Sequence, residues 1–189
     1  MRKIVAQTFV SLDGVMEAPE KWQLANDLMD EEMGKWVFAG YEAADALLLG
    51  RVTYQGFAGF WPTQSDADPF ARKINGLPKY VVSATLKTLE WKNSQLVKGN
   101  VPAEITKLKQ QAGRDILIPG SATLLSGLTK DGLVDEYQFL LHPIVVGRGK
   151  RLFAEGVDPT LLKLVDTKTF ATGAVALTYE RKGKAKLGS

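Results

Sequence analysis

The stretch DILIPGSATLLSGL at residues 115–128 decides the fold that the sequence predicts. Asp115 to Ile118 is expected to be a strand, because Ile116, Leu117 and Ile118 are apolar, and a helix is expected from Gly120 to Leu128. The same order of strand, glycine and helix occurs in ALLLGRVTYQGF at residues 46–57. Further buried strands are expected at residues 3–10 and 79–83. Strands that alternate with helices indicate a parallel sheet with helices on both faces.

The end of the chain has a different pattern. Two alternating apolar segments, residues 161–170 and 174–181, predict an antiparallel hairpin around Ala171-Thr172-Gly173. The expected fold is therefore a three-layer α/β fold with a mostly parallel, mixed sheet. Residues 1–181 form one domain in this interpretation, and residues 182–189 form a disordered basic tail.

Two connecting segments are also interpreted from their patterns. Apolar residues at a helical period begin at Leu24 and run to Val37, and Gly40 is expected to end this helix. Residues 61–78 contain three prolines and several polar residues, so this segment is expected to be mostly loop.

Composition excludes several classes of function. The chain of 189 residues has no cysteine and one histidine, so disulfides, thiolate catalysis and a metal site are not expected. The net charge of +3 arises mainly from basic residues near the C-terminus, and the folded body shows no basic stripe for a nucleic acid. No apolar run is long enough for a membrane span, and no signal peptide is evident. A cytoplasmic protein that binds neither nucleic acid nor membrane is expected.

Three predicted strand ends carry residues suited to an anionic ligand, and ligands of open α/β sheets bind at such ends. Gly50 precedes a helix that begins with Arg51 and Thr53, and Arg51 offers a forked cation for phosphate or is a surface arginine. The hydroxyls of Ser83 and Thr85 suit a phosphate or ribose, or bond to their own backbone. Small residues at 120–124 allow a pyrophosphate to approach the backbone at a helix start.

Candidate acids are concentrated near the first strand. Asp13 follows that strand and either faces the cleft or caps its own turn through Gly14. Glu17, Asp27 and Asp30 are the other candidates, and Asp27 and Asp30 are placed on the first long helix. His142 lies in a predicted strand before a proline and is interpreted as structural.

These segments together resemble the dihydrofolate reductase superfamily, and within it the reductase domain at the C-terminal half of bifunctional riboflavin-biosynthesis proteins. The resemblance extends from Lys3 to about Arg181. It is carried by five motifs in their order along the chain: Ser11-Leu12-Asp13-Gly14, Leu49-Gly50-Arg51-Val52-Thr53-Tyr54, Val82-Ser83-Ala84-Thr85-Leu86, Gly120-Ser121-Ala122-Thr123-Leu124, and His142-Pro143-Ile144-Val145-Val146-Gly147 with Leu152-Phe153. The phosphate loop of the family often begins with Gly-Gly, whereas Pro119 stands first here and removes one backbone donor.

The resemblance implies NADPH as cofactor and assigns roles to these residues. Asp13 would be catalytic and would face the nicotinamide and the substrate. Trp22, in a mobile flap over residues 14–22, and Asp27 would contact the substrate. The residues expected to bind the cofactor are Gly50, Arg51, Thr53, Tyr54, Ser83, Thr85, Gly120, Ser121, Ala122, Thr123 and Leu124.

Three functions remain open from the sequence. The first is an NADPH-dependent reductase acting on a pyrimidine- or pterin-like ring, similar to 5-amino-6-(5-phosphoribosylamino)uracil reductase. The second is a true dihydrofolate reductase, which requires a carboxylate on the first helix, such as Asp27. The third is a nucleotide-binding regulatory protein without turnover. The closing hairpin exposes a sheet edge, so a homodimer that buries this edge is expected.

Overall fold

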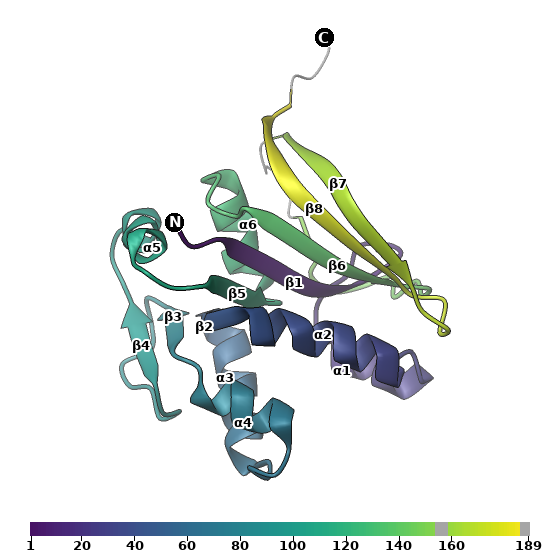
Figure 1. Cartoon of the computed structure of the whole chain (residues 1–189), viewed down its shortest axis with the longest axis horizontal. Helices are drawn as coiled ribbons and strands as arrows, with labels where there is room; N and C mark the ends of the chain where they lie inside the picture. Colours follow the sequence, from purple (N-terminus) through teal and green to yellow (C-terminus); the bar gives the residue numbers. More distant parts are fainter. Residues whose placement is uncertain (154–158, 186–189) are drawn as a thin grey trace.

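The computed structural model describes residues 1–153 and 159–185 and contains one eight-stranded sheet. Six strands are parallel, and β7 and β8 form an antiparallel hairpin at one edge (Figure 1). The strand order is β4-β3-β2-β5-β1-β6-β8-β7, which confirms the predicted mixed sheet. The strands are β1 (Ile4–Ser11), β2 (Ala44–Gly50), β3 (Lys79–Val82), β4 (Ser94–Val97), β5 (Asp115–Pro119), β6 (Glu136–His142), β7 (Thr160–Thr169) and β8 (Val175–Lys184).

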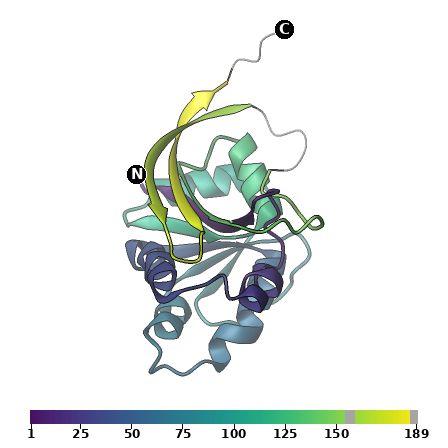
Figure 2. The same ribbon diagram turned by 90° about the vertical axis from the view of Figure 1, so that its right-hand side faces the viewer.

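Helices cover both faces of the sheet, as the alternating pattern predicts (Figure 2). The buried Val5 of β1 belongs to an apolar cluster with Met33 and Val37 of α2, whereas Ile4 and Ala6 belong to a second cluster on the α5 and α6 side. Successive side chains of a strand point to opposite faces, which explains this division. The helices are α1 (Pro19–Trp22), α2 (Glu31–Ala43), α3 (Arg51–Phe60), α4 (Pro69–Gly76), α5 (Val101–Gln110) and α6 (Ala122–Lys130), with short 3-10 turns at Leu24–Asn26 and Trp61–Thr63.

The first long helix differs from the prediction at both ends. It begins after Asp30, whose carboxylate accepts a hydrogen bond of 2.7 Å from the Met33 N–H, as an N-cap does. The helix also passes through Gly40 and ends at Ala43, so the prediction that Gly40 ends it is wrong. Gly40 instead makes room for a neighbour, because a Cβ there would lie 2.4 Å from the Gln7 amide nitrogen.

The segment expected to be loop contains α4. The Asp68 carboxylate accepts a 2.8 Å hydrogen bond from the Phe70 N–H, and Pro69 occupies the first helical position. Proline suits that position because its φ is already helical and no N–H is required there. Ala71 and Ile74 then bury the inner face of the helix. The prolines of this segment predict loop, but Pro69 starts a helix.

The closing hairpin is longer than expected. β8 continues through Lys182 to Lys184, three residues past the expected end of the domain, and residues 186–189 of the expected tail lie outside the described part. β7 is the edge strand, and Leu161, Leu164 and Val165 on it are exposed.

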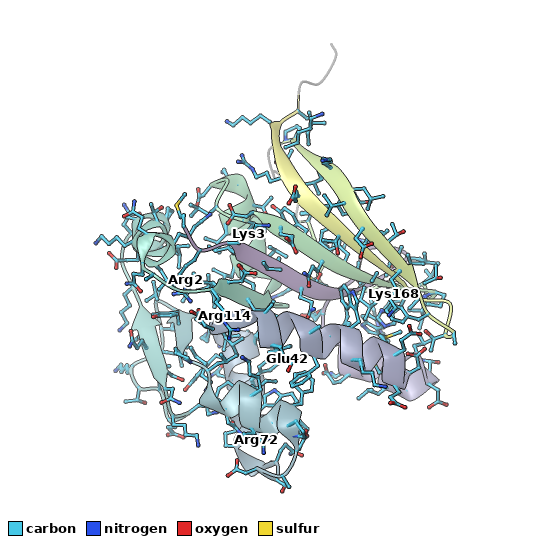
Figure 3. The ribbon with its side chains drawn as sticks, viewed as in Figure 1. Arg2, Lys3, Glu42, Arg72, Arg114 and Lys168 are labelled. Atoms are coloured by element: carbon cyan, nitrogen blue, oxygen red, sulfur yellow. The ribbon has the colours of Figure 1, made fainter. Side chains whose placement is uncertain are left out.

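At the amino ends of the central strands, Arg2 and Arg114 lie close together (Figure 3). The Asp45 carboxylate accepts a hydrogen bond from the Arg2 guanidinium and another, of 2.8 Å, from the Arg114 backbone N–H. These contacts join β1, β2 and β5 at that end, so the opposite, carboxyl ends remain for a site. Among the described residues, no helix is long and apolar enough to cross a membrane.

Candidate active site

The carboxyl ends of β2, β3 and β5 and the middle of β1 border a cleft of about 1740 Å³. β5 ends at Pro119, opposite Gln7, whereas β1 continues to Ser11. The sheet therefore has a gap beside β1, and this gap forms the inner part of the cleft. All three strand-end segments predicted to hold an anionic ligand contribute to the lining.

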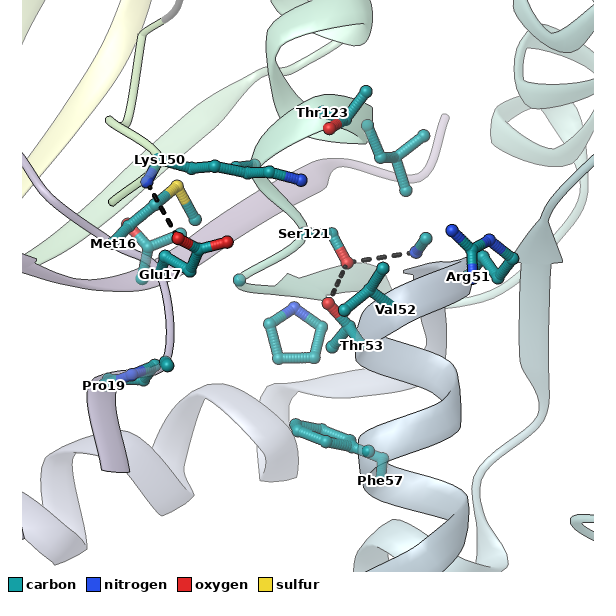
Figure 4. Close-up of a pocket in the computed structure, with 18 of the residues that line it drawn as sticks. Met16, Glu17, Pro19, Arg51, Val52, Thr53, Phe57, Ser121, Thr123 and Lys150 are labelled. Carbon is teal, nitrogen blue, oxygen red and sulfur yellow. Dashed lines mark hydrogen bonds between the residues drawn. The ribbon is translucent and has the colours of Figure 1, made fainter. Parts of the chain in front are cut away.

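Ser121 joins the two helix starts that face the cleft. Its Oγ accepts a hydrogen bond of 3.0 Å from the Gly50 N–H and donates one of 2.9 Å to the Thr53 hydroxyl (Figure 4). The α3 and α6 N-termini are thereby held side by side. Gly50 has no side chain to cap α3, and the Ser121 side chain does not cap α6. First-turn N–H groups of both helices therefore remain for an anion.

Gly120 opens the backbone to the cleft. It has φ of 69° and Ser121 has φ of 61°, so the chain turns through two left-handed residues between β5 and α6. A Cβ built on Gly120 would meet no atom within 4 Å. Its N–H donates to the Gln7 carbonyl at 3.1 Å, which fixes the turn against β1. A phosphate group can therefore approach this backbone closely, even with Pro119 in front of it.

The cleft lining carries more positive than negative charge. Its basic side chains are Lys21, Arg51, Arg148 and Lys150, and its acidic ones are Glu17, Glu20 and Asp131. Arg51 is exposed at the start of α3, where its guanidinium bonds to Gln55 at 3.1 Å. The side chain of Lys150 extends toward the start of α6, where Thr123 lies (Figure 4). Arg148 and Lys150 were missed in the sequence, although the basic, glycine-rich run at 147–150 was a signal.

Large apolar side chains form the outer walls. Val52 and Phe60 on α3 and Leu24 after α1 line the cleft while each is more than half exposed. Exposed apolar side chains that border a concave site are suited to the faces of aromatic rings. The walls therefore favour a ligand that combines flat rings with phosphate groups.

Ser83 and Thr85 line the cleft, and Ser83 also stabilises its own turn. The Ser83 Oγ accepts hydrogen bonds from the backbone N–H groups of Thr85 at 3.2 Å and Leu86 at 3.0 Å.

Tyr54 does not reach the cleft, contrary to its predicted role in cofactor binding. It is buried, and its hydroxyl accepts a 3.1 Å hydrogen bond from the Trp91 N–H. Although they are consecutive residues of α3, Thr53 points toward the cleft and Tyr54 points into the core.

The predicted flap is held at its start by the segment after β6. The Met16 N–H donates to the Lys150 carbonyl at 2.9 Å, and the Leu152 N–H donates to the Gly14 carbonyl at 2.8 Å. Trp22 lines the cleft, and its indole N–H donates to the Glu17 carbonyl at 3.0 Å.

Asp13 does not line the cleft, contrary to its predicted catalytic role. Its carboxylate accepts hydrogen bonds from the Ser11 hydroxyl at 2.7 Å and from the N–H groups of Val146 at 3.0 Å and Gly147 at 2.9 Å. These donors, the Ser11 hydroxyl above all, lower its pKa to about 2. Asp13 thus links the end of β1 to the segment after β6, and its charge is satisfied by that role.

Asp27 is also absent from the cleft, contrary to its predicted contact with the substrate. It is exposed in the turn before α2, with φ of 50°, and is not part of that helix. Of the four candidate acids, Glu17 alone lines the cleft. Its carboxylate accepts a 3.2 Å hydrogen bond from the Lys150 N–H (Figure 4).

His142 is fully buried, in line with its structural interpretation. Its Nδ1 lies 2.9 Å from the Leu140 carbonyl and its Nε2 lies 2.9 Å from the Gln23 amide nitrogen. Burial lowers the pKa of the imidazole. Nδ1–H therefore donates to the carbonyl, and Nε2 accepts from Gln23, as a neutral ring allows.

An α/β sheet with these helix starts, this gap and an antiparallel closing hairpin defines the dihydrofolate-reductase-like class of fold. A dihydrofolate reductase of Enterococcus faecalis complexed with NADP(H) shares the fold, with a TM-score of 0.61 and 17% identity over 95% of this chain and 96% of that one. A proposed riboflavin biosynthesis protein of Shewanella sp. PV-4 has a TM-score of 0.74 and 24% identity over 96% of this chain and 99% of that one.

Sequence comparison places the chain within that class. The family model of the RibD C-terminal domain matches residues 2–176. Uncharacterized protein YyaP of Bacillus subtilis (strain 168) is 31% identical over 185 residues, which cover 96% of each chain. The chain belongs to the RibD C-terminal domain family.

Proposed function

We propose that the protein is an NADPH-dependent reductase that transfers hydride to a small pyrimidine- or pterin-like ring. The observation that carries this proposal is the pair of helix starts that Ser121 joins beside the open backbone of Gly120. Two converging N-termini with free N–H groups suit a pyrophosphate, which carries two adjacent charged groups. Family membership and the NADP(H) complex of the structurally similar reductase support the same cofactor.

The residues of the cleft fit the parts of a dinucleotide. The turn from Gly120 to Thr123 and the start of α3 would hold the pyrophosphate, with Lys150 as a further cation. Arg51, with the nearby Ser83 and Thr85, would bind the adenosine 2′-phosphate. When bound, NADPH would supply the hydride, and the protein would orient its ring against the substrate. Glu17, the candidate acid that lines the cleft, would supply the proton that the substrate takes up together with the hydride.

The substrate is proposed to resemble 5-amino-6-(5-phosphoribosylamino)uracil rather than dihydrofolate. A true dihydrofolate reductase requires a carboxylate on the first helix that reaches the substrate. Asp27, the expected carboxylate, lies outside the cleft. The α2 side chains that line the cleft are Val37 and Tyr41, neither of which offers a carboxylate.

The proposal is tested by measuring NADPH oxidation with a panel of uracil-type and pterin-type rings, dihydrofolate among them. Binding of NADPH and NADH is measured in parallel for Arg51→Ala and for Arg72→Ala, a control on α4 outside the cleft lining. We expect Arg51→Ala to weaken NADPH by about tenfold, since one charge-assisted bond is lost at an exposed site, and NADH much less. Failure of the wild-type protein to bind NADPH refutes the proposal. Equal losses for both nucleotides remove Arg51 from the 2′-phosphate.

A further inference from the structure

Thr8 in β1 has a buried hydroxyl without a partner. The residue is 3% exposed and lines the cleft, and its Oγ1 makes no hydrogen bond within the described part of the chain. Three other described residues have a comparable unpaired side-chain atom, namely Asp30, Ser94 and Arg181, but none of them lines the cleft. Of these four residues, Thr8 alone lines the cleft.

Folding alone gives no reason for a hydroxyl at this position. Ala6 and Val10 flank Thr8 on the same face of β1, and both belong to an apolar cluster. Valine has nearly the same shape as threonine and would remove the cost of burying an unpaired hydroxyl. Thr129 shows the usual arrangement, since it is equally buried at 3% exposure but bonds to the Tyr137 hydroxyl at 3.0 Å.

The position of Thr8 indicates which part of a ligand it would meet. It follows Gln7, where pairing with β5 ends and the gap in the sheet begins. The Gln7 carbonyl also holds Gly120, at the proposed pyrophosphate site, through the 3.1 Å hydrogen bond. The apolar Met16 lines the cleft as well and belongs to the same cluster as Ala6 and Val10. A flat ring extending from the pyrophosphate into the gap would thus reach an apolar pocket with one unpaired hydroxyl.

We propose that the Thr8 hydroxyl binds the carboxamide of the nicotinamide ring and so positions that ring in the gap beside β1. The inference rests on the proposed function, because it takes NADPH as the ligand. A carboxamide has both an acceptor oxygen and donor N–H groups, and a hydroxyl complements either of them. Thr8 is then a residue kept for ligand binding at the expense of the stability of the free protein.

The experiment compares wild type, Thr8→Val, Thr8→Ser and the control Thr129→Val. Melting temperature is measured without ligand, and dissociation constants are measured for NADPH and for 2′-phospho-ADP-ribose, which lacks the nicotinamide. Thr8→Val should melt roughly 2–8 °C higher, because an unpaired hydroxyl is removed. It should bind NADPH roughly three- to tenfold more weakly and 2′-phospho-ADP-ribose unchanged. Thr8→Ser should retain the affinity for NADPH, and Thr129→Val should melt lower because the Tyr137 hydroxyl loses its partner.

Three outcomes overturn the inference. A lower melting temperature for Thr8→Val means that the hydroxyl has a partner within the protein. Unchanged NADPH affinity removes Thr8 from the ring site, and equal losses for both nucleotides mean that Thr8 acts through the structure of the cleft. Failure of wild type to bind either nucleotide refutes the proposed function instead, while the melting temperatures still report whether the hydroxyl is unpaired.

Discussion

Lys79 is expected to make the free energy of unfolding rise with pH in the alkaline range. Its side chain is fully buried at the start of β3, where Nζ donates to the carbonyls of Asn75 at 2.7 Å and Lys92 at 3.2 Å. Nζ also lies 4.1 Å from the centroid of the Trp91 ring. No carboxylate forms an ion pair with it among the described residues. Burial, with a smaller contribution from Lys92, lowers the pKa of Lys79 from 10.5 to about 8.

The direction of the effect follows from proton binding. Below pH 8 the folded and unfolded chains both hold the proton, so the cost of burying the charge is present in full. Between pH 8 and 10.5 the folded chain releases this proton while the unfolded chain keeps it, so the free energy of unfolding rises with pH. At about 1.36 kcal/mol for each pH unit, the complete gain is about 3 kcal/mol.

The measurement is urea unfolding at intervals from pH 7 to pH 10.5 for wild type and Lys79→Met. Wild type should gain up to about 3 kcal/mol relative to the variant over the upper part of this range. Lys107→Met, which removes an exposed lysine on α5, is the control and should leave the pH dependence of wild type unchanged. A difference between wild type and Lys79→Met that stays constant from pH 7 to 10.5 would refute the reasoning, because Lys79 would then titrate alike in both states.

Four further predictions follow from the cleft, the flap and the sheet edge. Gly120→Ala should lower the melting temperature by about 2–8 °C because of its left-handed φ of 69° and should weaken NADPH binding; Gly59→Ala in α3, where a Cβ meets no atom within 4 Å, should do neither. Glu17→Gln should reduce kcat while the dissociation constant for NADPH stays the same, and unchanged turnover would exclude Glu17 from proton transfer. Wild type should lose stability relative to Asp13→Asn as pH falls from 4 toward 2, because the native carboxylate, with its pKa near 2, is charged where the unfolded one, with its pKa of 3.8, takes up a proton; parallel acid-unfolding curves would contradict the role of Asp13. Finally, we propose a homodimer through β7, and light scattering that gives 20.7 kDa rather than about twice that mass would exclude it.

Local patterns in the sequence determined most of the fold. Apolar runs that end in Gly50 or near Gly120 are strands followed by helices, because a glycine allows the turn and a helix then covers the sheet. The closing hairpin was equally legible, since its apolar residues alternate. Local patterns misled at Gly40 and Pro69. There the deciding facts were the space needed by Gln7 and the cap supplied by Asp68, and only the first of these is a contact across the fold.

Local patterns also predicted part of the candidate site. Residues predicted because they follow strand ends, such as Arg51, Ser83 and Gly120, do line the cleft, since the carboxyl ends of parallel strands lie at one edge of the sheet. Asp13 follows a strand end as well, but backbone N–H groups more than 130 positions away in the sequence take its carboxylate.

The tertiary structure alone decided which side chains are free to bind a ligand. Lys150 reaches the cleft because the segment after β6 pairs with the flap, a contact between distant parts of the chain. Thr8 sits within a strand whose pattern predicts only burial, and the absence of a partner for its hydroxyl depends on everything packed around it. Periodicity in a sequence specifies which face of a strand a residue occupies. Whether a polar atom on that face finds its hydrogen bond within the protein is settled only when the other elements are in place.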